Sequence, residues 1–150
     1  MKPALHAGAG AIATLTILTF WMSTAVSELF LSYEAIASVK RAILYGMLVL
    51  IPALAMTGGS GFFLARGRQG RILDTKKKRM RLLAANGLLI LVPAAFYLDS
   101  KAASGEFDQL FYAVQVVELL VGLIQLTLLG LNFRDGLRLM AGQPIAQPPR

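Results

Sequence analysis

Four long apolar stretches dominate the chain, at about residues 7–31, 43–65, 82–98 and 109–131. A helix rises about 1.5 Å per residue, so each stretch is long enough, or nearly so, to cross a hydrocarbon core of about 30 Å. The sequence therefore predicts an all-α fold, an integral membrane four-helix bundle in which the helices alternate up and down.

Composition excludes the soluble alternative. Hydrophobic residues make up 56% of the sequence and charged residues only 15%, and the mean hydropathy is +0.62. Four buried core helices of this length would leave almost no residues to form a wet surface. There is no cysteine, which excludes disulfides, thiolate metal sites and cysteine nucleophiles.

The first stretch follows Lys2, as the apolar core of a secretory signal would. Such a core has about 7 to 15 residues, fewer than the stretch at 7–31 contains. We therefore expect a retained helix.

Basic residues are distributed unevenly between the two sides of the predicted bundle. Twelve of the fifteen lie on the side of the chain termini, and Lys40, Arg41 and Lys101 lie opposite. Eight of the twelve fall between the second and third stretches: Arg66, Arg68, Arg71, Lys76, Lys77, Lys78, Arg79 and Arg81. This asymmetry predicts a multi-pass protein of the bacterial inner (cytoplasmic) membrane with both termini in the cytoplasm, and a basic loop on anionic lipid headgroups. No aromatic residue interrupts the basic run, so we do not expect nucleic acid as a partner.

The predicted connections have about eleven, sixteen and ten residues, which suits antiparallel neighbours in one bundle. We expect a single domain at 1–141 and a flexible cytoplasmic tail at 142–150, where Pro144, Pro148 and Pro149 oppose a helix. Pro52 and Pro93 lie inside predicted helices and are expected to mark kinks.

A polar stripe follows one face of the fourth stretch. At about 100° per residue, Gln115, Glu118, Gln125 and Asn132 share a narrow sector. A carboxylate inside a membrane needs a cationic partner, water or a bound proton. We expect a buried polar site formed by Glu118, Gln115, Asn86 and Gln125, which serves either a ligand or helix packing. Lys40 and Arg41 could reach inward, with Glu28 as their more natural partner.

Small residues gather near the end of the second stretch, at Thr57, Gly58, Gly59, Ser60 and Gly61. They match neither a phosphate loop nor a dinucleotide fingerprint. The segment is expected to be flexible, either as a loosened or closely packed helix end or as an unwound segment whose amides line a small site.

His6 is the only histidine. It could be a haem ligand, but one imidazole per chain cannot fill both axial positions, so haem would need a methionine, lysine or water, or His6 from a second protomer. The alternative is an ordinary interfacial residue. Trp21 lies well inside the first stretch, where a buried indole needs a hydrogen-bond acceptor or a flat packing partner.

Three segments carry a resemblance to known proteins: TLTILTFWMSTAVSELF at residues 14–30, KKKRMRLLAANGLLILVPAAF at 76–96 and LNFRDGLRL at 131–139. They resemble a family of small four-span inner-membrane proteins of proteobacteria. The resemblance covers nearly the whole chain and implies the fold, but it carries over no catalytic residues. A looser likeness, by architecture alone, is to four-helix membrane b-type cytochromes, which use paired histidines that this sequence lacks.

These patterns leave three functions open. One is a non-enzymatic subunit that binds a cofactor, haem b or quinone, or partner subunits in membrane electron transfer. Another is a small transporter or proton-linked carrier that uses Glu118, and the third is a membrane assembly or scaffold protein. We expect a homo-oligomer or association with other membrane subunits. Catalysis and a metal site are not expected, because the sequence has no nucleophile beside a base and no metal-ligand cluster.

Overall fold

The computed structural model describes residues 3–64 and 71–140, all but a few of which are helical. Helix α1 spans Pro3–Phe30, α2 spans Tyr33–Leu64, α3 spans Arg71–Asn86, α4 spans Val92–Ala103 and α5 spans Gln109–Met140. A π-helical segment, η1 (Gly87–Leu91), joins α3 to α4 without a break. The predicted all-α four-helix bundle is therefore confirmed.

Four helical stretches are long and apolar enough to cross a membrane: Leu5–Phe30, Tyr33–Gly61, Lys77–Ala103 and Gln109–Arg138. Together they are the features of a multi-pass membrane protein. Large apolar side chains are widely exposed on the outside of the bundle, among them Leu29, Leu48 and Leu89. In water these apolar side chains would be exposed to solvent at a high cost, whereas in a bilayer they contact the lipid tails.

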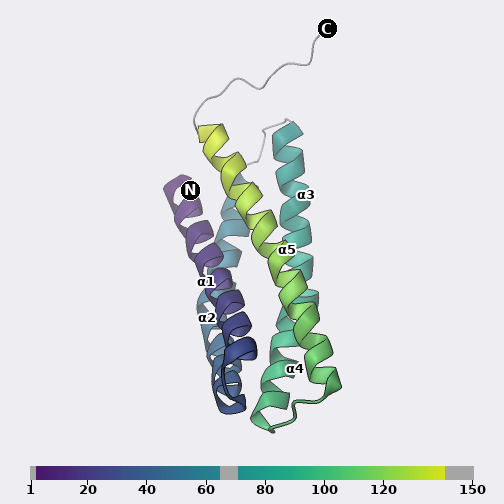
Figure 1. The fold of residues 1–150 in the computed structure, drawn as a ribbon. Coiled ribbons are helices and arrows are strands. Elements are labelled where there is room, and N and C mark those ends of the chain that lie inside the picture. Colours follow the sequence, from purple (N-terminus) through teal and green to yellow (C-terminus); the bar gives the residue numbers. More distant parts are fainter. Residues whose placement is uncertain (1–2, 65–70, 141–150) are drawn as a thin grey trace.

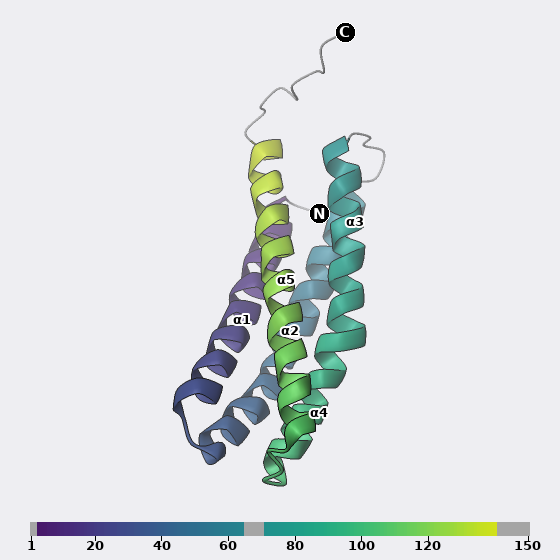
Figure 2. The same cartoon turned by 45° about the vertical axis from the view of Figure 1, so that its right-hand side comes forward.

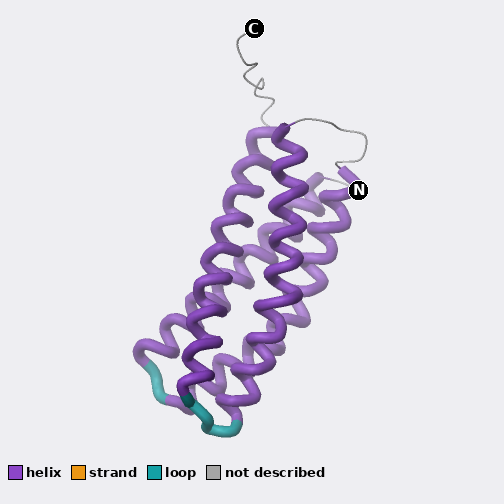
Figure 3. Tube along the Cα trace, turned by 90° about the vertical axis from the view of Figure 1, so that its right-hand side faces the viewer, coloured by secondary structure: helices purple, strands orange, loops and turns teal. Residues whose placement is uncertain are grey.

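The short connections from α1 to α2 and from α4 to α5 lie at one end of the bundle, which we call the turn end. The start of α1 and the end of α5 lie at the other end, which we call the terminal end (Figures 1 and 3). Helix α1 packs along α2 and against α5, α4 packs between α2 and α5, and α3 packs on α5. The turned view shows α1 and α3 on opposite sides of α5, with α2 passing behind α5 (Figure 2).

The predicted connection at 32–42 was wrong. Helix α2 already begins at Tyr33, so only Leu31 and Ser32 separate it from α1. The second predicted span began too late in the sequence because Lys40 and Arg41 interrupt the apolar residues. In the structure both side chains pair with acidic residues of the bundle, and the helix includes them.

The prediction of a basic loop at 66–81 was also wrong from residue 71 onward, where the chain is helical. Arg71, Lys76, Lys77, Lys78, Arg79 and Arg81 belong to α3. Lysine, arginine and leucine are good helix formers, and Asp74 lies in the first turn, where a negative charge is favoured. Arg66 and Arg68, like the tail at 142–150, lie outside the described residues.

The two prolines occupy different settings. Pro52 lies inside the continuous helix α2, whereas Pro93 is the second residue after the π-helical segment. Proline has no backbone N–H to donate and crowds the preceding turn. A wide π-turn is one way for a helix to accommodate this, and such turns are common at functional sites.

Candidate functional site

A buried charged cluster lies toward the turn end of the bundle, formed by Glu28, Lys40, Gln115 and Glu118. The ammonium Nζ of Lys40 lies 3.0 Å from Glu118 Oε2 and 3.8 Å from Glu28 Oε1, and it donates a hydrogen bond to Gln115 Oε1. The side chain of Lys40 is only 2% exposed. An ion pair this buried is costly to form and even more costly to break.

Three helices supply the cluster. Gln115 and Glu118 are three residues apart on α5, so they share a face, and Gln115 Nε2 donates to Glu118 Oε2 at 2.9 Å. Glu28 comes from the last turn of α1 and Lys40 from the second turn of α2. The predicted site at Glu118 and Gln115 thus includes Lys40, which was expected at the outer end of the second span with Glu28 as its more natural partner.

A signal for the burial of Lys40 does exist in the sequence. Ile36, Lys40, Ile43 and Met47 recur at the spacing of one helix face, and all four are buried. The apolar neighbours at this spacing indicate that Lys40 points inward.

A cavity of about 320 Å³ lies next to the cluster, between α1, α2, α5 and the continuous helical segment formed by α3, η1 and α4. Most of its lining is apolar, with Glu118 and Gln125 among the few polar side chains. On its α2 and α3–η1 walls the lining residues Ile51 and Leu88 are 50% and 65% exposed, on the lipid-facing surface. The cavity is within the size range of small-molecule sites and borders the bilayer.

Gln125 occupies the wall of this cavity nearer the terminal end. Its Nε2 donates to the main-chain oxygen of Leu83 at 3.1 Å, one turn before the π-helical segment. The carbonyl can only accept, so the amide orientation is fixed and Oε1 is left as a buried acceptor without a hydrogen-bond partner in the described part of the protein.

Asn86 does not join Glu118 and Gln115, so the site was wrong in this respect. The side chain is half-buried at the start of the π-helical segment and does not line the cavity. Gln125 bonds the main chain three residues earlier instead, because polar groups inside a membrane readily satisfy helix carbonyls.

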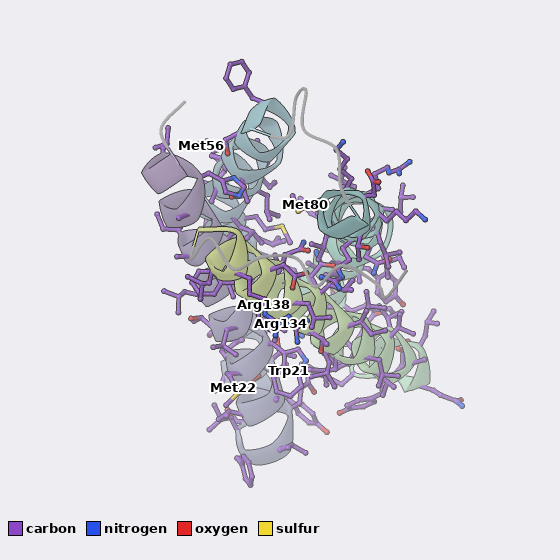
Figure 4. All side chains as sticks on the ribbon, turned by 90° about the horizontal axis from the view of Figure 1, so that it is seen from above. Trp21, Met22, Met56, Met80, Arg134 and Arg138 are labelled. Atoms are coloured by element: carbon purple, nitrogen blue, oxygen red, sulfur yellow. The ribbon has the colours of Figure 1, made fainter. Side chains whose placement is uncertain are left out.

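Trp21 crosses from α1 to α5 and lines the cavity. Its Nε1 donates to the main-chain oxygen of Leu119 at 2.9 Å, so the indole has the acceptor that its burial requires. Its ring packs against Gly122, where a Cβ would lie 2.9 Å from Trp21 Cδ1. Seen from the terminal end, Trp21 and Met22 project to different sides of α1 (Figure 4).

His6 lies near the terminal end, away from the cavity, and its Nδ1 is 2.8 Å from Ser60 Oγ. The predicted segment from Thr57 to Gly61 is helical, so the alternative of an unwound segment was wrong. The close-packed alternative agrees with the structure. A Cβ at Gly10 would touch Thr57, and a Cβ at Gly61 would lie 3.1 Å from His6. Small residues allow α1 to approach α2 here.

Ion pairs also hold the two ends of the bundle. At the terminal end, Arg79 of α3 binds Asp135 of α5, with Nη1 2.6 Å from Oδ2. Arg134 and Arg138, labelled in Figure 4, lie on the same helix. At the turn end, Arg41 Nε lies 2.8 Å from Asp99 Oδ1. No group of three or more metal-ligating side chains occurs among the described residues.

No protein-family model, curated protein or solved structure matches the chain. The function is therefore argued from the geometry of the charged cluster and the cavity.

Proposed function

We propose that the protein binds a lipid-soluble small molecule of the quinone class in the cavity, as a non-enzymatic component of a membrane electron-transfer system. The observation that carries this proposal is an apolar cavity of about 320 Å³ with the carboxyl group of Glu118 in its wall. Sites for small molecules combine such an apolar lining with a few fixed polar groups.

Access and recognition both support a membrane-borne ligand. Ile51 and Leu88 form part of the lining and are also exposed toward lipid, so a ligand can enter sideways from the bilayer. A ring with oxygen substituents suits the polar groups at Glu118 and Gln125, and an isoprenoid tail suits the apolar walls.

Haem suits the same cavity less well. None of the lining residues is a histidine, and the ring of His6 bonds Ser60 instead. A haem bound through His6 would have to lie at the terminal end, with a second ligand from Met, Lys, water or another protomer. A Soret band that disappears in His6→Ala would replace the quinone proposal by this one.

The single tryptophan provides a direct test. Trp21 lines the cavity, and quinones quench indole fluorescence on contact. We expect a short-tailed ubiquinone analogue, added to the protein in nanodiscs, to quench Trp21 saturably. An organic extract of protein purified in mild detergent should also contain quinone.

Two alanines of α3 give a matched pair of variants. Both alanines are exposed, but Ala84 lines the cavity and its neighbour Ala85 does not. Ala84→Phe should weaken saturable quenching by at least about tenfold, and Ala85→Phe should leave it unchanged. Equal quenching in both variants, or quenching that only rises linearly with quinone, would reject the proposal.

A second candidate function is proton-linked transport of a small solute. The specific observation in its favour is that Glu118 both lines the cavity and pairs with buried Lys40. It predicts solute flux in proteoliposomes that depends on a pH gradient and is lost in Glu118→Gln. If neither quinone binding nor flux is found, the assembly or scaffold function remains, with a homo-oligomer or other membrane subunits as partners.

The same proposal places the protein in the bacterial inner membrane with both termini in the cytoplasm. In the described part of the chain, the basic residues of α3 and those near the end of α5 lie toward the terminal end, whereas only Lys40, Arg41 and Lys101 lie toward the turn end, which supports this orientation. The basic first turns of α3 then lie at the cytoplasmic surface, where each lysine or arginine contributes about 1 kcal/mol to binding of anionic lipid.

A further inference from the structure

The charged cluster at the turn end contains one cation and two carboxyl groups. Lys40 is the only basic residue within 4.0 Å of either Glu28 or Glu118 in the described part of the chain. With all three groups ionised, the cluster would carry a net negative charge. A net charge inside the membrane-spanning region is costly, and binding a proton removes it.

Other charged groups near the cluster do not supply the missing positive charge. Helix α1 packs against α2 and α5, which face Glu28 with Lys40, Glu118 and the phenol group of Tyr112. Arg41, the neighbour of Lys40, is turned to Asp99 of α4.

The two carboxyl groups are in unequal surroundings. Glu118 Oε2 accepts hydrogen bonds from Lys40 at 3.0 Å and from Gln115 at 2.9 Å, and both bonds stabilise a negative charge on this carboxyl group. Glu28 Oε1 is buried without a hydrogen-bond partner and lies 3.8 Å from the ammonium. A neutral carboxyl group tolerates such a position far better than a charged one.

We infer that the cluster binds one proton at neutral pH and that this proton resides on the carboxyl group of Glu28. The proton comes from water at the turn end, since Glu28 lies two residues before the end of α1. On binding, an O–H bond forms on one carboxylate oxygen of Glu28, and on release the proton returns to water.

Release of the proton changes the partners of Lys40. The ammonium then lies between two carboxylates and is shared by them, which weakens its hold on Glu118 in the cavity wall. Glu28 is therefore a proton-binding site linked to the cavity, and its existence does not depend on which ligand the cavity takes.

Infrared difference spectroscopy of the protein in nanodiscs tests the inference, because a protonated carboxyl group has a carbonyl stretch that a carboxylate lacks. The other acidic residues are exposed or paired with arginine, so the cluster should give the only such band near neutral pH. Glu28→Gln should abolish the band. Lys40→Met should double it, because both carboxyl groups must then be neutral.

Aspartate variants assign the proton to its residue. Glu28→Asp should shift the frequency of the band and Glu118→Asp should not, while Asp99→Asn serves as the control that leaves it unchanged. The inference is overturned by a wild-type spectrum without the band, by a band that persists in Glu28→Gln, or by a frequency shift in Glu118→Asp alone.

Discussion

Trp21 on α1 donates its indole hydrogen bond to the main-chain oxygen of Leu119 on α5, over 2.9 Å. The contact closes one side of the cavity, and it is possible only because Gly122 leaves room for the ring. The α1–α5 packing therefore depends on a glycine one turn away from the hydrogen-bonded carbonyl.

Substitution of this glycine should displace the indole. In Gly122→Ala the new methyl group would lie 2.9 Å from Trp21 Cδ1, closer than carbon atoms pack. We therefore expect the free energy of unfolding to fall by about 1 to 3 kcal/mol and the fluorescence emission of Trp21 to change. Thermal unfolding in detergent, followed by fluorescence, measures both. Gly130→Ala on the same helix meets no atom within 4 Å and should instead stabilise the helix by up to about 1 kcal/mol. Equal effects of the two variants would refute the contact.

Loss of the buried cation should destabilise the bundle. Lys40→Met leaves Glu118 without its partner, and breaking a buried ion pair costs about 3 to 5 kcal/mol. The double variant Lys40→Met/Glu118→Gln should recover most of this loss, because no unpaired charge remains beside Gln115. Melting temperatures of the wild type, both single variants and the double variant complete the cycle. Lys101→Met, in the pairs at the turn end, should have a smaller effect, and additive losses would show that Lys40 and Glu118 are not coupled.

Asp108 should make stability depend on pH. A hydrogen bond from Lys101 and a second one from the backbone N–H of Phe111 lower the pKa of its carboxyl group. The folded state then binds fewer protons than the unfolded state, whose carboxyl group has its ordinary pKa of about 3.9. The stabilisation is thus complete above that pKa and is lost as the pH falls through the lower pKa of the folded state.

Melting curves between about pH 6 and pH 2 measure this dependence around the unfolded pKa. Asp108→Asn should make stability nearly independent of pH in this range. Glu106→Gln removes a charge that also pairs with Lys101 but makes no bond to the start of α5, and it should retain most of the pH dependence. An unchanged slope in Asp108→Asn would contradict the assignment.

Single cysteines can establish the orientation, since the chain has none of its own. Lys77→Cys should react with a membrane-impermeant thiol reagent only from the cytoplasmic side and Ala103→Cys only from outside, because basic residues are retained in the cytoplasm. Intact cells and inverted vesicles provide the two sides. Reaction of both positions from one side would contradict the four-span arrangement.

The amino-acid sequence by itself determined the class of fold. Inside a bilayer each segment must satisfy its own backbone hydrogen bonds, so apolar length alone predicts helices and their number. The polar face of α5 could also be predicted, because the positions of Gln115 and Glu118 on a helix follow from their spacing. The ends of the helices were harder to predict from the sequence. Lys40 and Arg41 lower the local hydropathy and so look like the edge of a membrane span, although α2 begins before them.

Only the tertiary structure decided what these side chains meet. The pairing of Glu118 with Lys40, the exclusion of Asn86 in favour of the Leu83 carbonyl, and the bond between His6 and Ser60 all join residues far apart in the chain. The cavity likewise exists only where four segments leave space between them. Spacing within a helix fixes the face on which a residue lies, but the packing of one helix on another fixes its partner, and for a charged group in a membrane the partner determines whether it remains charged.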